Sequence, residues 1–473
     1  MMKANQAKIP LYELLKRMAR SNPISFHVPG HKNGSIFPKQ ARPFFESILP
    51  FDMTELTGLD DLHAPQGIIA EAQDLAASFF GADDSYFLVG GSTAGNLSMI
   101  MSVCSPGDQI IVQRNSHKSI MNGLELSGAR PVFVAPEFDD AKGRYTAPSI
   151  PTVQEALRQH SKAKAVVLTY PDYFGGTFAL KEMIDLAHAY HIPVLVDEAH
   201  GVHFSLKGGL PASALELGAD VVVQSAHKMA PAMTMGSYLH VRSSLVAASS
   251  IAHYLQMLQS SSPSYPIMAS LDLARHYLAN LTARDLELII ESTTHVRDIL
   301  ANSELWDVLS ADDPLKITLQ AQRGMRGDML AQALEKEGVI PELSTHNQVL
   351  LIHGLAPFTE ADYVKNAVKR IDAQLKLTAN HDIIDVDKLF TENITTLELD
   401  YQTMQQCQRA QVPLRQSAGY IAAEAITPYP PGIPMILKGE RITEKHLELV
   451  RQLLKQGISI QHRDISRGIS IFQ

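Results

Sequence analysis

The sequence contains few cysteines, no long hydrophobic run and no excess of positive charge. Cys104 and Cys407 are the two cysteines, and their wide separation excludes a zinc-type spacing and a disulfide framework. No run approaches the roughly 18–20 apolar residues that cross a bilayer, and the N-terminus lacks the apolar core of a signal peptide. A net charge of −9 and a pI of about 6.1 argue against a nucleic-acid surface. We therefore expect a soluble, cytoplasmic protein without a metal site that binds neither nucleic acid nor membranes.

The chain of 473 residues is too long for a single hydrophobic core, so two or three domains are expected. Residues 1–65 are predicted to form an N-terminal arm, with a short amphipathic helix and loops rich in polar residues. Residues 66–300 alternate strand and helix patterns and are predicted to form a large domain. A smaller α/β domain is predicted over residues 301–380, and a C-terminal region over residues 381–473.

Short apolar strands are the clearest pattern of the large domain. They are rich in Val and Ile rather than alternating, which is typical of strands buried on both faces of a parallel sheet. Seven are predicted: Tyr86–Val89, Gln109–Val112, Pro131–Val134, Ala165–Leu168, Val194–Val196, Asp220–Val223 and Gly236–Val241. The fold class is therefore α/β, with a mostly parallel seven-stranded sheet and a smaller C-terminal α/β domain.

Residues suited to chemistry follow most of these strands. In an open α/β sheet, ligands bind just beyond the carboxyl ends of the strands. A serine and a threonine, a histidine, an acid and a lysine come to that edge, at Ser92-Thr93, His117, Asp197 and Lys228. A phosphate cradle, an aromatic cap, an acid and a lysine together indicate a site for pyridoxal 5'-phosphate (PLP).

A lysine is needed to hold PLP as a Schiff base, and three His-Lys pairs are candidates. Lys32 lies in a glycine-rich loop with no strand before it, and Lys118 follows His117, so that its side chain is expected to point away from the site. Lys228 follows a buried strand and lies one strand beyond Asp197. We therefore interpret Lys228 as the Schiff-base lysine.

Asp197 ends a strand that is expected to be buried, where a carboxylate is costly unless it is paired. The pyridinium nitrogen of PLP would pair it, and a protonated ring is the electron sink that PLP chemistry needs. The alternative is that Asp197 caps a helix. His200 follows at a spacing that would let its imidazole reach the ring hydroxyl.

Ser92 and Thr93 follow two glycines at a strand–helix junction, where free N–H groups and the helix dipole favour a phosphate. A tight turn with capping residues is an equal alternative, because neither a Walker loop nor Gly-x-Gly-x-x-Gly is present. Ser225 and His227 are further candidates for phosphate contacts, and His117 is a candidate to stack on the pyridine ring.

The combined motifs resemble the Orn/Lys/Arg decarboxylase family of fold type I PLP enzymes. The Ser-x-His-Lys, Asn-x-His-Lys-Ser and Pro-Tyr-Pro-Pro-Gly elements carry the resemblance, which extends over almost the whole chain. The chain is similar to the short, Gram-positive type, without the N-terminal wing domain of the long members. The matching segments are Phe26–Gly34, Glu55–Gly67, Gly90–Asn96, Asn115–Ser119, Asp197–Gly201, Ser225–Lys228, Pro428–Pro434 and Gly439-Glu440.

The resemblance implies an aminotransferase-like fold and PLP-dependent decarboxylation of a basic amino acid. The products would be agmatine from arginine or cadaverine from lysine, in polyamine biosynthesis. It implies active sites at the interface of a homodimer or higher homo-oligomer. It also implies that Lys228 or His227 returns a proton to Cα, and it assigns the ring and phosphate contacts to Asp197, His117, Ser92, Thr93 and Ser225.

Two alternative functions stay open. An aminotransferase or aldolase could use the same scaffold. An aminotransferase normally holds the substrate carboxylate with an arginine, and the sequence places none there, with Arg415 and Arg441 as the open alternatives. A PLP-binding regulatory relative without turnover is the non-enzyme alternative. The chain also departs from the Pro-Thr-Tyr-Tyr-Gly-like run of many relatives, because Asp172 adds a negative charge in Pro171–Gly175.

A basic substrate needs a carboxylate for its distal cation, because an unpaired charge in a closed site is costly. Glu424 begins the run that leads into Pro-Tyr-Pro-Pro-Gly and is the predicted anchor, although it could instead cap a helix or face solvent. The competing acids are Asp52, Glu55, Asp60, Asp61 and Asp172.

Overall fold

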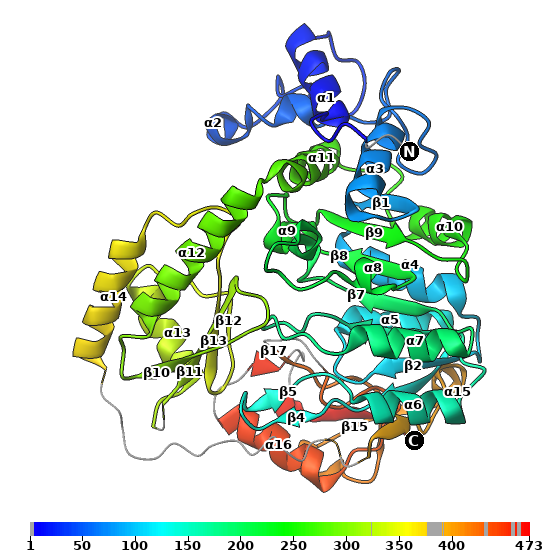
Figure 1. The fold of residues 1–473 in the computed structure, drawn as a ribbon. Helices are drawn as coiled ribbons and strands as arrows, with labels where there is room; N and C mark the ends of the chain where they lie inside the picture. The colour runs from blue at the N-terminus through cyan, green and yellow to red at the C-terminus, as the bar shows by residue number, and fades with distance from the viewer. Residues whose placement is uncertain are drawn as a thin grey trace. The chain divides into compact units, whose positions relative to one another are not determined.

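The computed structural model describes residues 4–322, 324–375, 390, 392–429, 434–455, 459–460 and 465–473. The chain divides into two compact units, each built from separate stretches of sequence. Unit 1 comprises Met1–Val103 and Pro193–Thr282, and unit 2 comprises Cys104–Ile192 and Ala283–Gln473. Figure 1 labels many of their helices and strands.

The strands of unit 1 lie in the order β1 (Asp84–Leu88), β9 (Ser237–Val241), β8 (Val221–Gln224) and β7 (Val194–Asp197). β7 and β8 are parallel, whereas β9 is antiparallel to both β8 and β1. Helix α4 (Gly91–Val103) packs closely on this sheet, because a Cβ at Gly95 would lie 2.7 Å from Leu88 Cδ1 and 2.9 Å from Val223 Cγ1. The chain therefore brings the start of α4 to the strands that carry Asp197 and Lys228.

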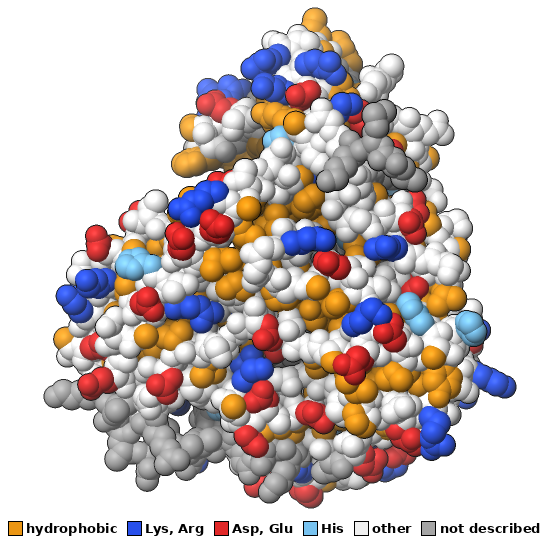
Figure 2. Space-filling model, viewed as in Figure 1, with side chains coloured by type: hydrophobic (Ala, Val, Ile, Leu, Met, Phe, Trp, Pro, Cys, Tyr) orange, Lys and Arg blue, Asp and Glu red, His pale blue; other side chains and the backbone are white. Residues whose placement is uncertain are grey.

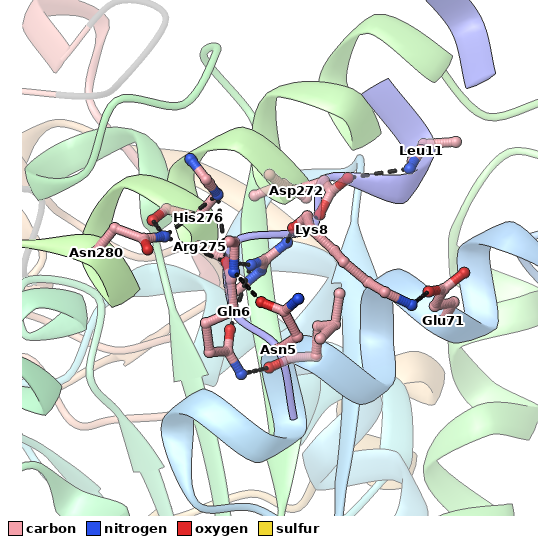
Figure 3. Close-up of polar contacts among 12 residues, drawn as sticks. Asn5, Gln6, Lys8, Leu11, Glu71, Asp272, Arg275, His276 and Asn280 are labelled. Atoms are coloured by element: carbon pink, nitrogen blue, oxygen red, sulfur yellow. Dashed lines mark hydrogen bonds and ion pairs between the residues drawn. The ribbon is translucent and has the colours of Figure 1, made fainter. Parts of the chain in front are cut away.

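The first residues of unit 1 are fastened to the rest of the unit. Helix α1 (Pro10–Ser21) packs on α3 (Ile68–Phe80) and α11 (Tyr265–Asn280), and it buries Leu11 and Leu15. Figure 3 shows side chains of α11 reaching the backbone just before α1. The remaining helices are α2 (Arg42–Phe45), η1 (Leu49–Phe51), η2 (Val202–Leu206), α8 (Ala214–Leu217), α9 (Ala226–Met229) and α10 (Ala248–Leu258).

The parallel strands of unit 2 lie in the order β6 (Val166–Thr169), β2 (Gln109–Gln113) and β3 (Arg130–Val134). A further strand, β14 (Ile394–Thr396), pairs antiparallel with β3 and was not expected from the sequence. Helices α5 (Lys118–Ser127), α6 (Ile150–Gln159) and α7 (Leu180–Ala189) connect or follow these strands.

A second sheet of unit 2 is antiparallel, with β10 (Trp306–Leu309), β11 (Lys316–Ala321), β13 (Gln348–Ile352) and β12 (Leu343–Ser344) in that order. Trp306, Leu319 and Val349 pack in its core with apolar residues of the surrounding helices. Those helices are α12 (Ala283–Leu300), α13 (Gly327–Lys336) and α14 (Ala361–Gln374).

The end of unit 2 has a separate apolar core around Ile426, Ile436 and Val450. Its three-stranded sheet has the order β15 (Arg409–Val412), β19 (Ile469–Phe472) and β16 (Ile421–Ala422). The other elements are the hairpin β4 (Phe138–Asp139) and β5 (Arg144–Tyr145), the pair β17 (Pro428–Tyr429) and β18 (Ser459–Ile460), and the helices α15 (Tyr401–Gln406), η3 (Leu414–Gln416), α16 (Glu444–Lys455) and η4 (Ile465–Arg467).

The predicted fold class is confirmed, and each of the seven predicted strands is present with ends shifted by no more than two residues. The helical region predicted over Met268–Ala301 consists of two helices, because the backbone is extended at Leu281 between α11 and α12. The predicted linker Thr378–Asp382 lies outside the described residues.

The surface carries no dominant charge on the face drawn in Figure 2, where Lys and Arg are interspersed with Asp and Glu. Among the helices that the structure describes, none combines the length and the apolar character needed to cross a bilayer. Within the same residues, no cluster of His, Cys, Asp and Glu is suited to a metal ion.

Candidate active site

The carboxyl ends of β7 and β8 lie side by side and carry the acid and the lysine predicted from the sequence. The two strands are parallel, with Asp197 opposite Val223, so both chains leave the sheet at the same edge. Ser225 follows β8, and Lys228 lies in the short helix α9 directly after it. The fold therefore brings Asp197, Ser225 and Lys228 to one edge of unit 1.

Asp197 is buried, with 2% of its surface exposed, and its two carboxylate oxygens differ in their hydrogen bonding. Oδ2 accepts a hydrogen bond of 2.9 Å from Asn96 Nδ2 on α4. Oδ1 is buried and has no hydrogen-bond partner among the described residues. A buried carboxylate oxygen without a donor is costly, so this atom is suited to pair with a protonated ring nitrogen.

Three serine hydroxyls gather at the first turn of α4. Ser92 Oγ lies 2.6 Å from Ser225 Oγ and donates to Ser237 Oγ at 3.2 Å. The helix begins at Gly91, whose φ of 72° favours glycine. Hydroxyl groups and the free N–H groups of a helix start are suited to bind a phosphate. Thr93, also predicted here, is exposed on α4.

The three candidate lysines have different surroundings. Lys228 Nζ lies 3.1 Å from His200 Nε2, within the same unit as Asp197 and the serines. Lys32 Nζ donates to the carbonyl of His27 within the arm. Lys118 is exposed in the first turn of α5. Only Lys228 among the three follows the strand next to Asp197.

The predicted histidines occupy different positions. His200 lies beside Lys228, as described above. The Nδ1 atom of His227 lies 3.1 Å from the carbonyl oxygen of Gly236, and its backbone N–H donates to the same oxygen. His117 belongs to unit 2, where it is exposed and caps α5, because its Nδ1 accepts the backbone N–H of Ser119 at 3.2 Å.

Glu424 lies in the C-terminal region of unit 2. Its Oε1 accepts a hydrogen bond of 2.6 Å from the backbone N–H of Ser470 in β19. The run that follows is described only in part, because residues 430–433 of the Pro-Tyr-Pro-Pro-Gly element lie outside the described residues. The role of Glu424 toward a substrate stays a prediction.

Asp60, one of the competing acids, organises the loop before α3. Its carboxylate accepts the backbone N–H groups of Asp61, Gln66, Gly67, Ile69 and Ala70 at 2.7–3.3 Å. Partial burial acts to raise the pKa of Asp60, but these hydrogen bonds outweigh it and hold the pKa below its usual value. Asp60 therefore acts as an anionic cap of α3.

The other acids also differ in their partners. Asp52 Oδ2 lies 3.2 Å from His31 Nε2, and Asp61 Oδ1 accepts the backbone N–H of His63. Glu55 is exposed. Asp172 holds its own loop, since Oδ1 accepts the N–H groups of Phe174 and Gly176 and Oδ2 lies 3.6 Å from Arg144 Nη2. The negative charge that departs from the family pattern is thus paired with Arg144.

Arg114 is a buried cation that the sequence analysis did not single out. It follows β2 and donates to the carbonyl oxygens of Pro434 and Met435 at 2.7 and 3.0 Å. It also forms an ion pair of 2.8 Å with Glu440 Oε2. Arg114 thereby ties the described end of the proline-rich segment to the loop that leads to His117.

Asn96 and Ser237 are further contacts that sequence analysis missed. Asn96 was a usable signal, because it is an amide side chain near the start of a helix that follows a strand. Ser237 opens β9, far along the chain from Ser92, and no local pattern connects the two residues.

Family models match most of the chain. The model described as "Orn/Lys/Arg decarboxylase, major domain" matches residues 9–313, and "Orn/Lys/Arg decarboxylase, C-terminal domain" matches residues 386–461. Among individual relatives, the Bacillus subtilis "Uncharacterized protein YaaO" is 45% identical over 460 residues, covering 96% of this chain and 95% of the relative. The arginine decarboxylase of Bacillus subtilis is 36% identical over 474 residues, covering 97% of this chain and 96% of the relative.

A solved structure extends the similarity to the fold. Lysine decarboxylase A from Pseudomonas aeruginosa superposes with a TM-score of 0.82 at 19% sequence identity. The match covers 99% of this chain and 81% of that structure. At this identity the match establishes the fold, and the family rests on the sequence comparisons.

Proposed function

Because the chain belongs to the Orn/Lys/Arg decarboxylase family, we propose that it is a PLP-dependent α-decarboxylase of a basic amino acid. Arginine, which would give agmatine, is the first candidate substrate, because the Bacillus subtilis relative is an arginine decarboxylase. Lysine, which would give cadaverine, is the second. The observation that carries the proposal is the unpaired, buried Oδ1 of Asp197 at the sheet edge that also carries Lys228.

The residues of unit 1 fit PLP in three respects. Lys228 supplies an amine for the covalent link, Asp197 Oδ1 supplies an acceptor for the ring N–H, and Ser92, Ser225 and Ser237 surround the helix start suited to the phosphate. His200 is proposed to contact the ring hydroxyl, with Thr93 as an additional phosphate contact. His117 of unit 2 is proposed to stack on the ring.

When bound, PLP supplies an electron sink for the bond that joins Cα to the departing carboxylate. The protein's part is to keep the ring nitrogen protonated through Asp197 and to move a proton to Cα. Lys228 and His227 are the proposed proton donors. His227 Nδ1 lies 3.1 Å from the carbonyl oxygen of Gly236, so its hydrogen is directed to that carbonyl and Nε2 is the ring atom that would exchange a proton with Cα.

An aminotransferase of this fold would hold the substrate carboxylate with an arginine. Arg441 is paired with Glu398 at 3.1 Å and donates to the carbonyl of Gly419, and Arg415 is exposed. These positions support decarboxylation over transamination. A silent regulatory relative is disfavoured by the complete set of Lys228, Asp197 and the serine cluster.

The arm supports a homodimer or higher homo-oligomer as the working form. Five of its apolar side chains, Ile24, Phe26, Val28, Ile36 and Phe44, are between 62% and 94% exposed. Monomeric proteins rarely leave such a group of apolar side chains in water, so a second copy of this chain is the proposed cover. Static light scattering at assay concentration tests this, and a fully active monomer would contradict it. The proposed location is the cytoplasm.

Glu424 is the proposed anchor of the distal cation of the substrate. Glu424→Gln should raise KM for the basic substrate roughly 10–100-fold, because an unpaired charge entering a closed site costs several kcal/mol. The absorption spectrum of bound PLP should not change. An unchanged KM in this variant, together with a raised KM in Glu55→Gln or Asp61→Asn, would move the anchor to the arm.

The experiment that tests the function is a substrate panel. Purified protein with PLP is supplied with arginine, lysine and ornithine in turn, and carbon dioxide and the amine are measured. Release from arginine or lysine supports the proposal. Formation of a 2-oxo acid would favour the aminotransferase alternative, and the absence of any product from all three would favour the silent relative.

A further inference from the structure

A row of buried polar side chains crosses all four strands of unit 1. Glu198 directly follows β7, Gln224 ends β8, His240 lies in β9 and Ser85 lies in β1. Glu198, Gln224 and His240 are fully buried, and Ser85 is 5% exposed. Polar groups inside a sheet cost free energy unless they are hydrogen-bonded. Each member of this row therefore needs a hydrogen-bond partner inside the protein.

Hydrogen bonds connect the row from end to end. Glu198 Oε1 accepts the backbone N–H of Ala214 at 2.7 Å, and Oε2 lies 2.6 Å from Gln224 Nε2. Gln224 Oε1 lies 3.1 Å from His240 Nε2, and His240 Nδ1 lies 2.7 Å from Ser85 Oγ. In the register of the sheet, Ser85 stands directly opposite His240.

Burial shifts the pKa values of the two ionisable members of the row, Glu198 and His240. It raises the pKa of Glu198 to about 8, although the hydrogen bonds from Gln224 and Ala214 act in the opposite direction. Burial also lowers the pKa of His240 to about 3. His240 is therefore neutral at physiological pH, whereas Glu198 changes its charge in the neutral-to-alkaline range.

No positively charged side chain pairs with Glu198 among the described residues. The ionisable side chains on neighbouring elements include Asp197 at the end of β7, His200 just after it, His203 in η2, Glu216 in α8, His227 and Lys228 in α9, and His240 in β9. The hydrogen-bond donors of Glu198 are the neutral groups of Ala214 and Gln224. The ionised form of Glu198 is therefore stabilised by neutral hydrogen-bond donors alone.

The hydrogen bonds of this row can point in either of two directions, because an amide and a neutral imidazole each have one donor side and one acceptor side. When Glu198 is ionised, it accepts from Gln224 Nε2, so Gln224 Oε1 accepts from His240 Nε2 and His240 Nδ1 accepts from Ser85. When Glu198 holds a proton, it donates to the Gln224 oxygen. The amide nitrogen then donates to His240 Nε2, and the ring proton moves to Nδ1 and points to Ser85. The heavy-atom positions are the same in both arrangements.

We propose that a proton on Glu198 sets the donor-to-acceptor direction of the hydrogen bonds that run through Gln224 and His240 to Ser85. We also propose that Glu198 is a positioning residue of the cofactor site. Glu198 directly follows Asp197, and Gln224 directly precedes Ser225. The N–H of Glu198 also donates to Val223 O at 2.8 Å. These hydrogen bonds thus connect the ends of the two strands that lead to Asp197 and Lys228. The positioning role rests on the proposed function, whereas the reversible chain does not.

The first test is thermal unfolding of the full-length protein between pH 6 and 9, without added PLP. Because the pKa of Glu198 is raised in the folded state, folding takes up a proton, and wild-type stability falls as pH rises toward and through that pKa. Glu198→Gln is neutral throughout. Its melting temperature should rise relative to wild type by at least about 2 °C from pH 6 to pH 9. Glu182→Gln, at an exposed position in α7, is the control and should show no such trend. A difference between Glu198→Gln and wild type that does not change with pH would overturn the proposal.

The second test needs no substitution at Glu198. In protein labelled with ¹⁵N only at histidine, the His240 signals are assigned by their loss in His240→Asn. We expect the proton of His240 to move from Nδ1 to Nε2 as pH rises through about 8, with no imidazolium formed. One tautomer at every pH from 6 to 9 would overturn the reversible chain, even if Glu198→Gln fails to fold.

The positioning role has its own readout in the absorption spectrum of bound PLP. The pH midpoint of its spectral change should shift in Glu198→Gln and should not shift in Glu182→Gln. An unshifted midpoint in Glu198→Gln would overturn the positioning role. The histidine measurement does not depend on turnover, so a protein that fails to decarboxylate any basic amino acid would refute the proposed function and leave the chain itself open to test.

Discussion

The buried ion pair between Asp272 and Arg275 on α11 should be the main polar interaction that holds the N-terminal segment against this helix. Figure 3 shows both side chains on α11, pointing toward the chain before α1. Both are fully buried, and Arg275 Nη2 lies 2.6 Å from Asp272 Oδ1. Arg275 donates to the carbonyl oxygens of Gln6 and Lys8 at 2.7 and 2.6 Å, and Asp272 Oδ2 accepts the N–H of Leu11.

Arg275→Met keeps much of the side-chain volume but removes the charge and the donors. Asp272 would remain buried with only the backbone N–H groups of Leu11 and Tyr12 as donors, and leaving a buried charge unpaired costs about 3–5 kcal/mol. Desolvation by burial already raises the pKa of Asp272, against the effect of Arg275. Without Arg275 the pKa should rise further, so Asp272 takes up a proton on folding and the loss of stability should be larger at pH 8 than at pH 5.

The assay is urea unfolding followed by circular dichroism, together with hydrogen exchange of residues 5–21. Arg284→Met, which removes an exposed ion pair with Glu287, is the control and should change stability by no more than about 0.5 kcal/mol. The double variant Asp272→Asn/Arg275→Met removes both charges and should be less destabilised than Arg275→Met alone. The reasoning would be refuted if Arg275→Met behaved like Arg284→Met, or if the double variant lost as much stability as the single one.

Three further predictions concern the site and its supports. Borohydride reduction of the protein with PLP should fix the cofactor on Lys228, as read by peptide mapping, and an adduct on Lys32 or Lys118 would reject the assignment. Asp197→Asn should lower kcat about a thousand-fold, roughly 4 kcal/mol of transition-state stabilisation, while PLP affinity falls much less; near-normal turnover would remove Asp197 from the mechanism. Asp60→Asn should cost about 1–2 kcal/mol of stability at pH 7 through loss of the anionic cap. Because the pKa of Asp60 is lowered in the folded state, the wild-type advantage should be full above pH 5 and should be lost as pH falls through that pKa, which acid titration of both proteins would measure.

Much of the fold could be predicted because strands buried on both faces are short, uninterrupted runs of Val, Ile and Leu. Val221–Val223 and Val194–Val196 are such runs, and both lie where they were expected. Strand β14 was missed because Ile394–Thr396 is a short segment at the edge of its sheet and is only partly buried. The break between α11 and α12 was missed because Leu281 is apolar and neither glycine nor proline marks the end of the first helix.

The candidate site was predictable where its residues directly follow a strand. Asp197 and Lys228 could be found in this way, because the end of a parallel strand determines which edge of the sheet a residue reaches. Contacts between distant segments could not be found. Ser237 meets Ser92 across 145 positions of sequence, and Arg114 meets Glu440 across 326 positions. In the buried row, His240 left a local signal, because it is a polar residue inside an apolar strand, but its connection to Gln224 and Ser85 depends on the order of the strands in the sheet.

The most direct test of decarboxylation at Lys228 is one reaction followed by NMR. Arginine and lysine labelled with ¹³C at the carboxyl group are each supplied to the protein with PLP in D₂O. The account predicts labelled carbon dioxide and an equal amount of amine carrying one deuterium at the former Cα from at least one of the two, and neither product with Lys228→Ala. A labelled 2-oxo acid in place of carbon dioxide, or equal release by wild type and Lys228→Ala, would contradict it.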